Sequence, residues 1–367
     1  AAGGAPVSVT VVVACRNEKR AIASFLESLA WLDRDGLALD AIIADGLSTD
    51  GTRRLLTEFA NTHTWCRVID NPGRIVATGL NQAIRLARGE FIVRMDAHTA
   101  YESDYVVRSI AVLNVTGASN AGGPQRSRVT GFWQRAIHAG FHSPFASGGA
   151  HFRDDDYRGP VDTVPYGCWR RDFLLGIGLF DESLVRNQDD ELNARIRLAG
   201  GTIWQDPSIL SWYSPRSTLR GLWLQYLQFG FWRVAVLRKH RAGSVRHFLP
   251  GAALLTGVAL LLAVAAGVER QAAAAVLLIL ASIYTLLSAW ASVRAARREG
   301  WKLLPALPIT FATYQMAYAT GFCAGLVYWW LLRGRTPPRL FGGDGTGKQR
   351  NRANPPRISD QGPGDSA

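Results

Sequence analysis

The sequence predicts an α/β domain built on an open, mixed but mostly parallel sheet flanked by helices, followed by transmembrane helices. Short apolar runs alternate with segments of helical periodicity through residue 95, which is typical of a parallel sheet whose crossovers are helices. Residues 1–247 mix charged and apolar residues as a soluble domain does, whereas residues 248–332 are dominated by long uncharged runs. These observations divide the chain into two regions.

The strands and helices of the first region follow from the period of their apolar residues. Residues 7–14, VSVTVVVA, are too short for a helix and too apolar for an edge strand, so we expect a central buried strand there. The other expected elements are helices at 20–32, 50–59 and 75–87 and strands at 41–44, 67–70 and 90–95.

Polar residues end three of these strands. Asn17 and Glu18 follow the first strand, Asp45 ends the second, and Asp96 and His98 follow the fourth. Ligands of open α/β sheets bind at the carboxyl ends of the strands, so we expect these residues to converge on one edge. Asp96 and His98 lie two apart in an extended segment, where their side chains share a side and can hold one divalent cation against a diphosphate. The alternative interpretation is a set of plain polar turns.

Charge and cysteine content narrow the function classes. The formal net charge is +12, but much of the excess flanks the apolar runs or lies in the C-terminal tail. Anionic membrane lipids are the simpler partner for such segments, so we expect no nucleic acid. The four cysteines are scattered without a C-x-x-C pair, which fits a reducing cytoplasm and no structural zinc. No G-x-G-x-x-G follows the first strand, which argues against a nicotinamide or flavin cofactor.

The second region predicts about three transmembrane helices, at 248–268, 272–293 and 309–332, since each run is long enough to cross a hydrocarbon core. A basic juxtamembrane segment at 236–247 precedes them and places the α/β domain in the cytoplasm by the positive-inside tendency. We therefore expect an integral protein of the plasma (inner) membrane. Residues 333–367 indicate a disordered tail. The arginines of this tail favour the cytoplasmic side of the membrane, whereas a third crossing would place the tail on the outer side. The side on which the tail lies therefore stays open.

Three segments taken in order resemble the nucleotide-sugar half of the family 2 inverting glycosyltransferases, which have the GT-A fold: VSVTVVVACRNE, IIADGLSTDGT and NPGRIVATGLNQAIRLARGEFIVRMDAHT. The resemblance covers roughly residues 7–235. Within the family, the chain is most similar to the membrane-attached enzymes of succinoglycan-type exopolysaccharide synthesis. It implies a metal-dependent glycosyltransferase domain over residues 1–235.

The resemblance also assigns roles on the donor side. It implies that Asp45 contacts the nucleotide base, with Asn17 and Glu18 nearby, and that the donor is a UDP-linked sugar. Asp96 would begin an Asp-x-Asp motif that binds the diphosphate through Mn²⁺ or Mg²⁺. His98 replaces the second acid of that motif, and because histidine prefers transition metals, Mn²⁺ is favoured.

A second acidic segment supplies the general base. The family pattern Glu-Asp-x-Asp/Glu-Leu fits residues 188–192 with Gln188 in place of the first Glu. The resemblance makes Asp189 the base that deprotonates the acceptor hydroxyl, with Asp190 and Glu191 on the acceptor side. Adjacent acids raise one another's pKa, which suits a base that works near neutrality. The alternative is an acidic helix start that complements the helix dipole.

Residues 225–233, QYLQFGFWR, are loosely similar to the Gln-x-x-Arg-Trp motif of processive relatives, with a spacing that does not match. Gln225, Gln228, Trp232 and Arg233 are thus candidates for the acceptor side. The same segment fits an amphipathic helix on the membrane surface with its aromatic residues at the interface.

Together these features predict a glycosyltransferase that moves a sugar, with inversion, from a nucleotide sugar to a polyprenyl-linked glycan acceptor at the membrane, in polysaccharide or cell-envelope synthesis. Two alternatives stay open. The departures at Gln188 and His98 allow a non-catalytic nucleotide-sugar-binding membrane scaffold. A nucleotidyltransferase on a similar sheet would release diphosphate from a nucleoside triphosphate, but it leaves Asp189 and the apolar runs unexplained.

Overall fold

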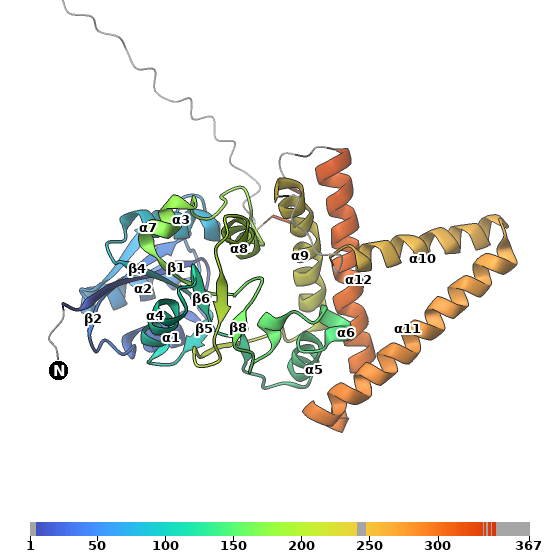
Figure 1. Ribbon diagram of the computed structural model, residues 1–367, viewed down its shortest axis with the longest axis horizontal. Coiled ribbons are helices and arrows are strands. Elements are labelled where there is room, and N and C mark those ends of the chain that lie inside the picture. Colours follow the sequence, from blue (N-terminus) through green and yellow to red (C-terminus); the bar gives the residue numbers. More distant parts are fainter. Residues whose placement is uncertain (1–4, 241–246, 333, 335–336, 339, 343–367) are drawn as a thin grey trace, which may run out of the picture.

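The computed structural model describes residues 5–240, 247–332, 334, 337–338 and 340–342. Figure 1 shows an α/β domain at one end, two long helices side by side next to it, and a hairpin of two further helices that extends away. Residues 241–246 of the expected juxtamembrane segment lie outside the described part, and so does most of the expected tail at 333–367.

The α/β domain is built on an eight-stranded sheet in the order β3-β2-β1-β4-β9-β6-β10-β8. Strand β1 pairs in parallel with β2 and β4, and β9 pairs antiparallel with β4 and β6. The sheet is therefore open, mixed and mostly parallel, as predicted. Its strands are β1 (Val7–Cys15), β2 (Leu37–Asp45), β3 (Cys66–Asp70), β4 (Phe91–Asp96), β6 (Asn120–Gly122), β8 (Gly159–Pro160), β9 (Cys168–Arg170) and β10 (Ile203–Gln205).

Strand β1 is central because it is apolar on both faces. Val9, Val11 and Val13 pack against the side covered by α1 and α4, whereas Val12 packs on the opposite face with Leu80 of α3. All five side chains are fully buried. The flanking helices are α1 (Ile22–Ala30), α2 (Thr52–Thr62), α3 (Val76–Leu86), α4 (Tyr105–Thr116), α7 (Arg171–Gly176) and α8 (Gln188–Leu198).

A smaller three-stranded sheet, in the order β5-β11-β7, follows the carboxyl end of β4. Its strands and the short helices near it are β5 (Thr99–Tyr101), β7 (Arg126–Ser127), β11 (Ser211–Tyr213), α5 (Phe132–Phe141), α6 (Pro144–Ser147) and the 3-10 turn η1 (His151–Arg153).

Two local predictions are corrected by these elements. The second strand runs Leu37–Asp45 rather than 41–44, because residues 37–40 continue the parallel pairing with β1. Residues 97–98 form a turn between β4 and β5 rather than an extended segment. Alternation along a strand is therefore not what brings Asp96 and His98 together.

The C-terminal region contains α9 (Leu219–His240), α10 (Leu249–Ala266), α11 (Arg270–Glu299), η3 (Trp301–Leu303), α12 (Leu307–Leu326) and the π-helical turn η4 (Val327–Leu331). Within the described residues, α10 and α11 are long and apolar enough to cross a membrane, and most of their side chains are exposed. The third expected span forms α12 and η4, and many apolar side chains of α12 are buried against neighbouring helices.

Helices α9 and α12 pack at backbone distance through glycines. A Cβ at Gly321 would lie 1.9 Å from the Leu227 carbonyl oxygen, and one at Gly230 would lie 2.2 Å from the Tyr318 carbonyl oxygen. The α9 side chain Trp232 is fully buried. The interpretation of residues 225–233 as an amphipathic surface helix is therefore wrong, because α12 and its neighbours cover the aromatic side of α9.

Candidate functional site

A cavity of about 1940 Å³ lies between the α/β domain and the C-terminal helices. It starts at the carboxyl ends of β1 and β4, where the sequence predicts the ligand site, and continues past α9 and α12 to α10 and α11. The predicted site residues that line it are Glu18, Asp96, His98, Asp189, Asp190, Gln225 and Arg233.

The guanidinium of Arg94 joins the two central carboxylates of this cavity. Asp96 ends β4 and Asp189 lies in the first turn of α8, so they come from distant parts of the chain. Arg94 Nη2 donates to Asp96 Oδ1 at 3.0 Å, and Arg94 Nη1 donates to Asp189 Oδ1. Because the Arg94 side chain is only 4% exposed, this shared contact is fixed by the surrounding core.

The cluster of Arg94, Asp96 and Asp189 has one positive charge for two carboxylates, so it carries excess negative charge when both are ionised. Although 28% of the Asp189 side chain is exposed to the cavity, its surroundings enclose the carboxylate. Burial raises the pKa of Asp189 to about 7; the Arg94 charge opposes this rise, and Asp96 and Asp190 add to it. A carboxyl with such a pKa accepts and releases protons near neutral pH.

His98 lies against Glu18 at the sheet end of the cavity, with Nδ1 at 3.6 Å from Glu18 Oε1. Burial lowers the pKa of His98, but its hydrogen bond to Glu18 and the charge of Asp96 outweigh that effect and raise it above the usual value. No cluster of three His, Cys, Asp or Glu suited to a metal occurs among the described residues. Asp96 and His98 offer one carboxylate and one imidazole facing the cavity, which fits a cation whose other ligands are phosphate and water oxygens.

Asp45 and Asn17 lie next to this end of the cavity, and neither is among the described residues that line it. Asp45 is 1% exposed, accepts a hydrogen bond from Ser48 Oγ at 2.5 Å and lies 3.4 Å from Arg53 Nη1. Asn17 Oδ1 accepts from the Thr49 amide at 2.9 Å. The two residues are thus linked through one loop, residues 45–49, and their role stays a prediction.

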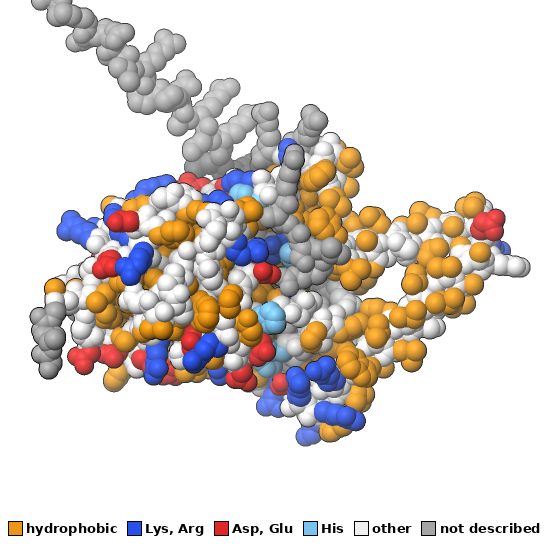
Figure 2. Space-filling view, in the orientation of Figure 1, with side chains coloured by type: hydrophobic (Ala, Val, Ile, Leu, Met, Phe, Trp, Pro, Cys, Tyr) orange, Lys and Arg blue, Asp and Glu red, His pale blue; other side chains and the backbone are white. Residues whose placement is uncertain are grey.

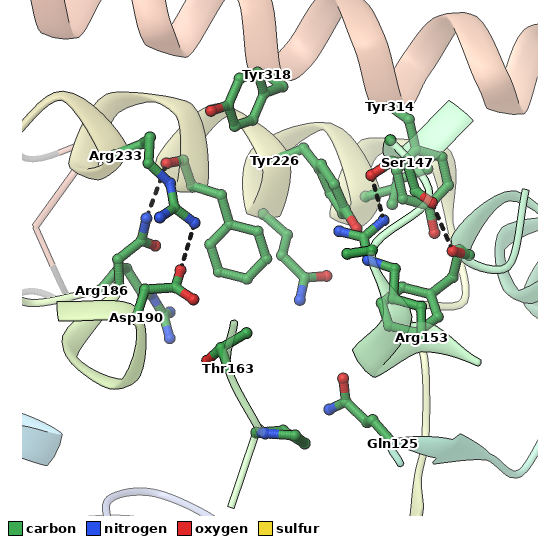
Figure 3. A pocket seen from close by; sticks show the side chains of 18 of the residues that line it. Gln125, Ser147, Arg153, Thr163, Arg186, Asp190, Tyr226, Arg233, Tyr314 and Tyr318 are labelled. Carbon is green, nitrogen blue, oxygen red and sulfur yellow. Dashed lines mark hydrogen bonds and ion pairs between the residues drawn. The ribbon is translucent and has the colours of Figure 1, made fainter. Parts of the chain in front are cut away.

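Figure 3 shows the part of the cavity beneath α9 and α12. At one side Arg233 Nη2 donates to Asp190 Oδ2 at 2.6 Å, which ties α9 to the start of α8. At the other side Arg153 lies beside Ser147, Tyr226 and Tyr314. Two guanidinium groups therefore face the same hollow from opposite walls.

Two predicted acceptor-side residues lie elsewhere. Trp232 donates from Nε1 to the Phe341 carbonyl oxygen at 2.8 Å inside a buried cluster. Gln228 Oε1 accepts from Arg186 Nε at 3.2 Å, and its Nε2 donates to the Leu340 carbonyl oxygen at 3.0 Å. Neither belongs to the cavity lining among the described residues, so both contribute to packing between α9 and the chain that follows α12.

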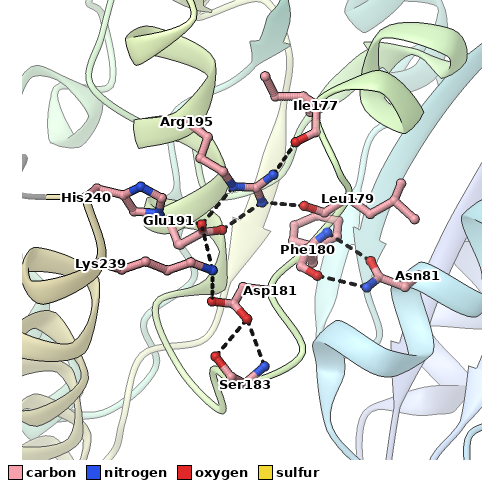
Figure 4. Close-up of polar contacts among 10 residues, drawn as sticks. All are labelled: Asn81, Ile177, Leu179, Phe180, Asp181, Ser183, Glu191, Arg195, Lys239 and His240. Atoms are coloured by element: carbon pink, nitrogen blue, oxygen red, sulfur yellow. Dashed lines mark hydrogen bonds and ion pairs between the residues drawn. The ribbon is translucent and has the colours of Figure 1, made fainter. Parts of the chain in front are cut away.

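Glu191 is also corrected from an acceptor-side residue to a buried structural one. Its side chain is 0% exposed and accepts hydrogen bonds from Arg195 Nε and the His240 ring, each at 2.7 Å. Lys239 lies 3.7 Å from the same oxygen and bonds to Asp181. Figure 4 shows how this cluster fixes α8 against the end of α9. Such a buried charge is satisfied only if every partner is in place.

The sequence analysis missed Arg94, Arg153, Tyr226 and Tyr314. A signal existed for Arg94, because a charged residue inside the apolar run FIVRMD lies two positions from Asp96 and shares its face of the strand. The other three come from separate segments that only tertiary packing brings together, so no local pattern marks them.

Comparisons with known proteins identify the family of this chain. The family model described as Glycosyl transferase family 2 matches residues 10–171. The chain is 31% identical over 246 residues to the succinoglycan biosynthesis protein ExoA of Rhizobium meliloti, which covers 66% of this chain and 74% of that protein. It is 25% identical over 240 residues to a dolichyl N-acetyl-alpha-D-glucosaminyl phosphate glucuronosyltransferase of Methanococcus voltae, covering 63% and 74%.

A solved structure shares the fold. The mannosyltransferase PcManGT from Pyrobaculum calidifontis, in complex with GDP-Man and Mn²⁺, aligns with a TM-score of 0.59 and 21% identity over 86% of each chain. This likeness confirms the predicted GT-A-like fold, and the two relatives confirm the resemblance that the motifs indicate. The chain belongs to glycosyl transferase family 2.

Proposed function

We propose that this chain transfers a sugar from a nucleotide-sugar donor, with inversion, to a lipid-linked glycan acceptor at the membrane. The observation that carries the proposal is the meeting of Asp96 and Asp189 at Arg94 inside a cavity that continues to two exposed apolar helices. The name of the Methanococcus voltae relative places its acceptor sugar on a dolichyl phosphate, which supports the same acceptor class here.

Asp189 is the proposed base. The acceptor hydroxyl oxygen attacks the anomeric carbon of the donor while the bond from that carbon to the diphosphate breaks, and the bonding electrons leave with the nucleoside diphosphate. The hydroxyl proton passes to the Asp189 carboxylate, whose pKa of about 7 suits this transfer at neutral pH. Attack from the side opposite the leaving group inverts the anomeric configuration. Arg94 acts as a positioning residue, because it fixes the Asp189 carboxylate.

The donor's diphosphate belongs at the sheet end of the cavity. Asp96 and His98 would hold a divalent cation there, and when bound that cation would neutralise the charge that develops on the leaving diphosphate. The Mn²⁺ bound to PcManGT supports a divalent metal of this class. Because PcManGT binds GDP-Man, a GDP-linked donor is an alternative to the UDP-linked donor that we expect. Glu18 orients the imidazole of His98, and the base would lie near Asp45 and Asn17.

The membrane attachment that we propose is a helical hairpin. Helices α10 and α11 expose apolar side chains along their lengths, and Figure 2 shows them extending from the polar domain with basic residues gathered near the end of α11. Arg238 and Lys239 precede α10, and Arg297 and Arg298 follow the apolar part of α11, so both flanks favour the cytoplasmic side. Two crossings would return the chain to that side, which agrees with its basic C-terminal segment.

Incubating membranes that contain the protein with labelled nucleotide sugars, UDP- and GDP-linked donors included, tests the proposal. We expect one donor to label the extracted lipid fraction, with the new glycosidic bond of opposite anomeric configuration to the donor when analysed by NMR. Nucleotide-sugar binding without any turnover would favour the scaffold alternative. A product that retains the anomeric configuration of the donor would refute the single-displacement step.

A further inference from the structure

The cavity has an apolar half that the transfer step does not use. Beyond α9 and α12 its wall is formed by α10 and α11, with side chains that include Leu254, Val258, Leu261, Ile283 and Leu287. An opening of this kind between exposed apolar helices is continuous with the hydrocarbon core if α10 and α11 cross the membrane.

Arg153 lines the cavity beside Tyr226 of α9 and Tyr314 of α12. It follows the turn at Gly148 and Gly149, both of which have positive φ, and its Nη1 donates to the Ser147 carbonyl oxygen at 2.8 Å. Its guanidinium lies 4.7 Å from the ring centre of Phe141. No carboxylate within the described segments forms a salt bridge with it, and its buried Nε has no hydrogen-bond partner.

The contrast with Arg233 shows why this matters. Arg233 faces the same hollow, but its charge is balanced by Asp190 at 2.6 Å. Arg153 has no carboxylate partner among the residues described. The Tyr226 hydroxyl hydrogen-bonds to it, and Tyr226 and Tyr314 lie beside it (Figure 3), but neither side chain carries a negative charge. A cation in a half-buried aromatic setting is stabilised by an anion that balances its charge.

We propose that Arg153 binds the phosphate of the lipid-linked acceptor, and that its isoprenoid chain reaches the membrane between α10 and α11. This rests on the proposed function and adds to it the access route and the anchoring residue. Arg153 and Asp189 line the same cavity, so a sugar carried on a phosphate held by Arg153 would lie in the cavity that Asp189 faces. A soluble phosphate would leave the apolar half unfilled, which favours a lipid.

Binding measurements on the full-length protein in detergent test the phosphate site. The probes are a polyprenyl monophosphate and the matching polyprenol, which differ only in the anion. We expect the wild type to prefer the phosphate, and Arg153→Met to lose about 10- to 100-fold in phosphate affinity with little change for the polyprenol. Arg135→Met, which removes an exposed arginine of α5 outside the cavity lining, is the matched control and should keep the preference.

Two further results would overturn the phosphate site. One is an unchanged preference in Arg153→Met, and the other is a wild type that binds both probes equally. Arg153→Lys keeps the charge and should recover part of the preference, which separates loss of the anion contact from loss of folding. Nucleotide-sugar binding, measured on the same samples, distinguishes the two proposals. Intact donor binding without a preference for the phosphate refutes this inference alone. A preference for the phosphate without donor binding refutes the proposed function.

The access route has its own variant. Gly257 of α10 lines the cavity, and a Cβ there meets no atom of the described chain within 4 Å, so a large side chain can be accommodated by the fold. Gly257→Trp should weaken binding of the polyprenyl monophosphate while geranyl phosphate, whose short chain does not reach that far, binds as before. Equal binding of the long-chain lipid by Gly257→Trp and the wild type would rule out this route.

Discussion

The pH dependence of transfer follows from the environment of Asp189. Its pKa is raised to about 7, chiefly by burial, and only the ionised carboxylate accepts the acceptor proton. The rate should therefore fall as the pH falls through that value. The ionised fraction changes from about 10% at about pH 6 to about 90% at about pH 8, which predicts a rise of about tenfold across that interval.

Single-turnover rates with saturating donor and lipid acceptor, at constant ionic strength, measure this change directly. The pKa of His98 is also raised, because its hydrogen bond to Glu18 and the charge of Asp96 outweigh the effect of burial, and protonation of the imidazole would weaken binding of the metal-linked donor. Measuring donor binding at each pH separates the two groups. In His98→Asp, which removes the imidazole, the dependence of the transfer rate should persist. A flat rate profile, or one that follows donor binding alone, would refute the role given to Asp189.

The remaining predictions concern the donor site and the helix packing. Asp96→Ala should weaken donor binding when a divalent cation is present and leave metal-free binding unchanged; an equal defect in both conditions would contradict its role as a ligand. His98→Asp should shift metal preference from Mn²⁺ toward Mg²⁺, and an unchanged metal profile would place the imidazole outside the coordination shell. Gly321→Ala should lower the free energy of unfolding by about 1–3 kcal/mol, because its Cβ would meet a carbonyl oxygen of α9 at 1.9 Å, whereas Gly257→Ala should be neutral in thermal unfolding.

The strands of the α/β domain could be predicted because a strand that is buried on both faces is apolar along its whole length. Strand β1 is apolar at successive positions, and the structure buries Val12 on one face and Val11 and Val13 on the other. The end of the fourth strand indicates where Asp96 lies, and the family resemblance assigns Asp189 to the same site. Arg94, which joins them, could have been predicted from the alternation of side chains along β4, because it lies two positions from Asp96.

The failures have a common physical cause, since periodicity shows which residues share a face but not which neighbour covers that face. Successive residues of a helix point about 100° apart, so Glu191 points away from the cavity that Asp189 lines. Its partners Lys239 and His240 come from α9 and cannot be inferred locally. Likewise, Trp232 is buried in a cluster with Trp329 and Phe341, which lie about 100 residues further along the chain.

The most direct test of the central claim compares Asp189→Asn with the wild type in two measurements on the same membranes. The amide keeps the size of the carboxylate but cannot accept the acceptor proton at neutral pH. Transfer of labelled sugar to the lipid acceptor should be abolished, while the affinity for the nucleotide sugar stays close to that of the wild type. Transfer that survives in Asp189→Asn, or equal loss of transfer and donor binding, would contradict the account.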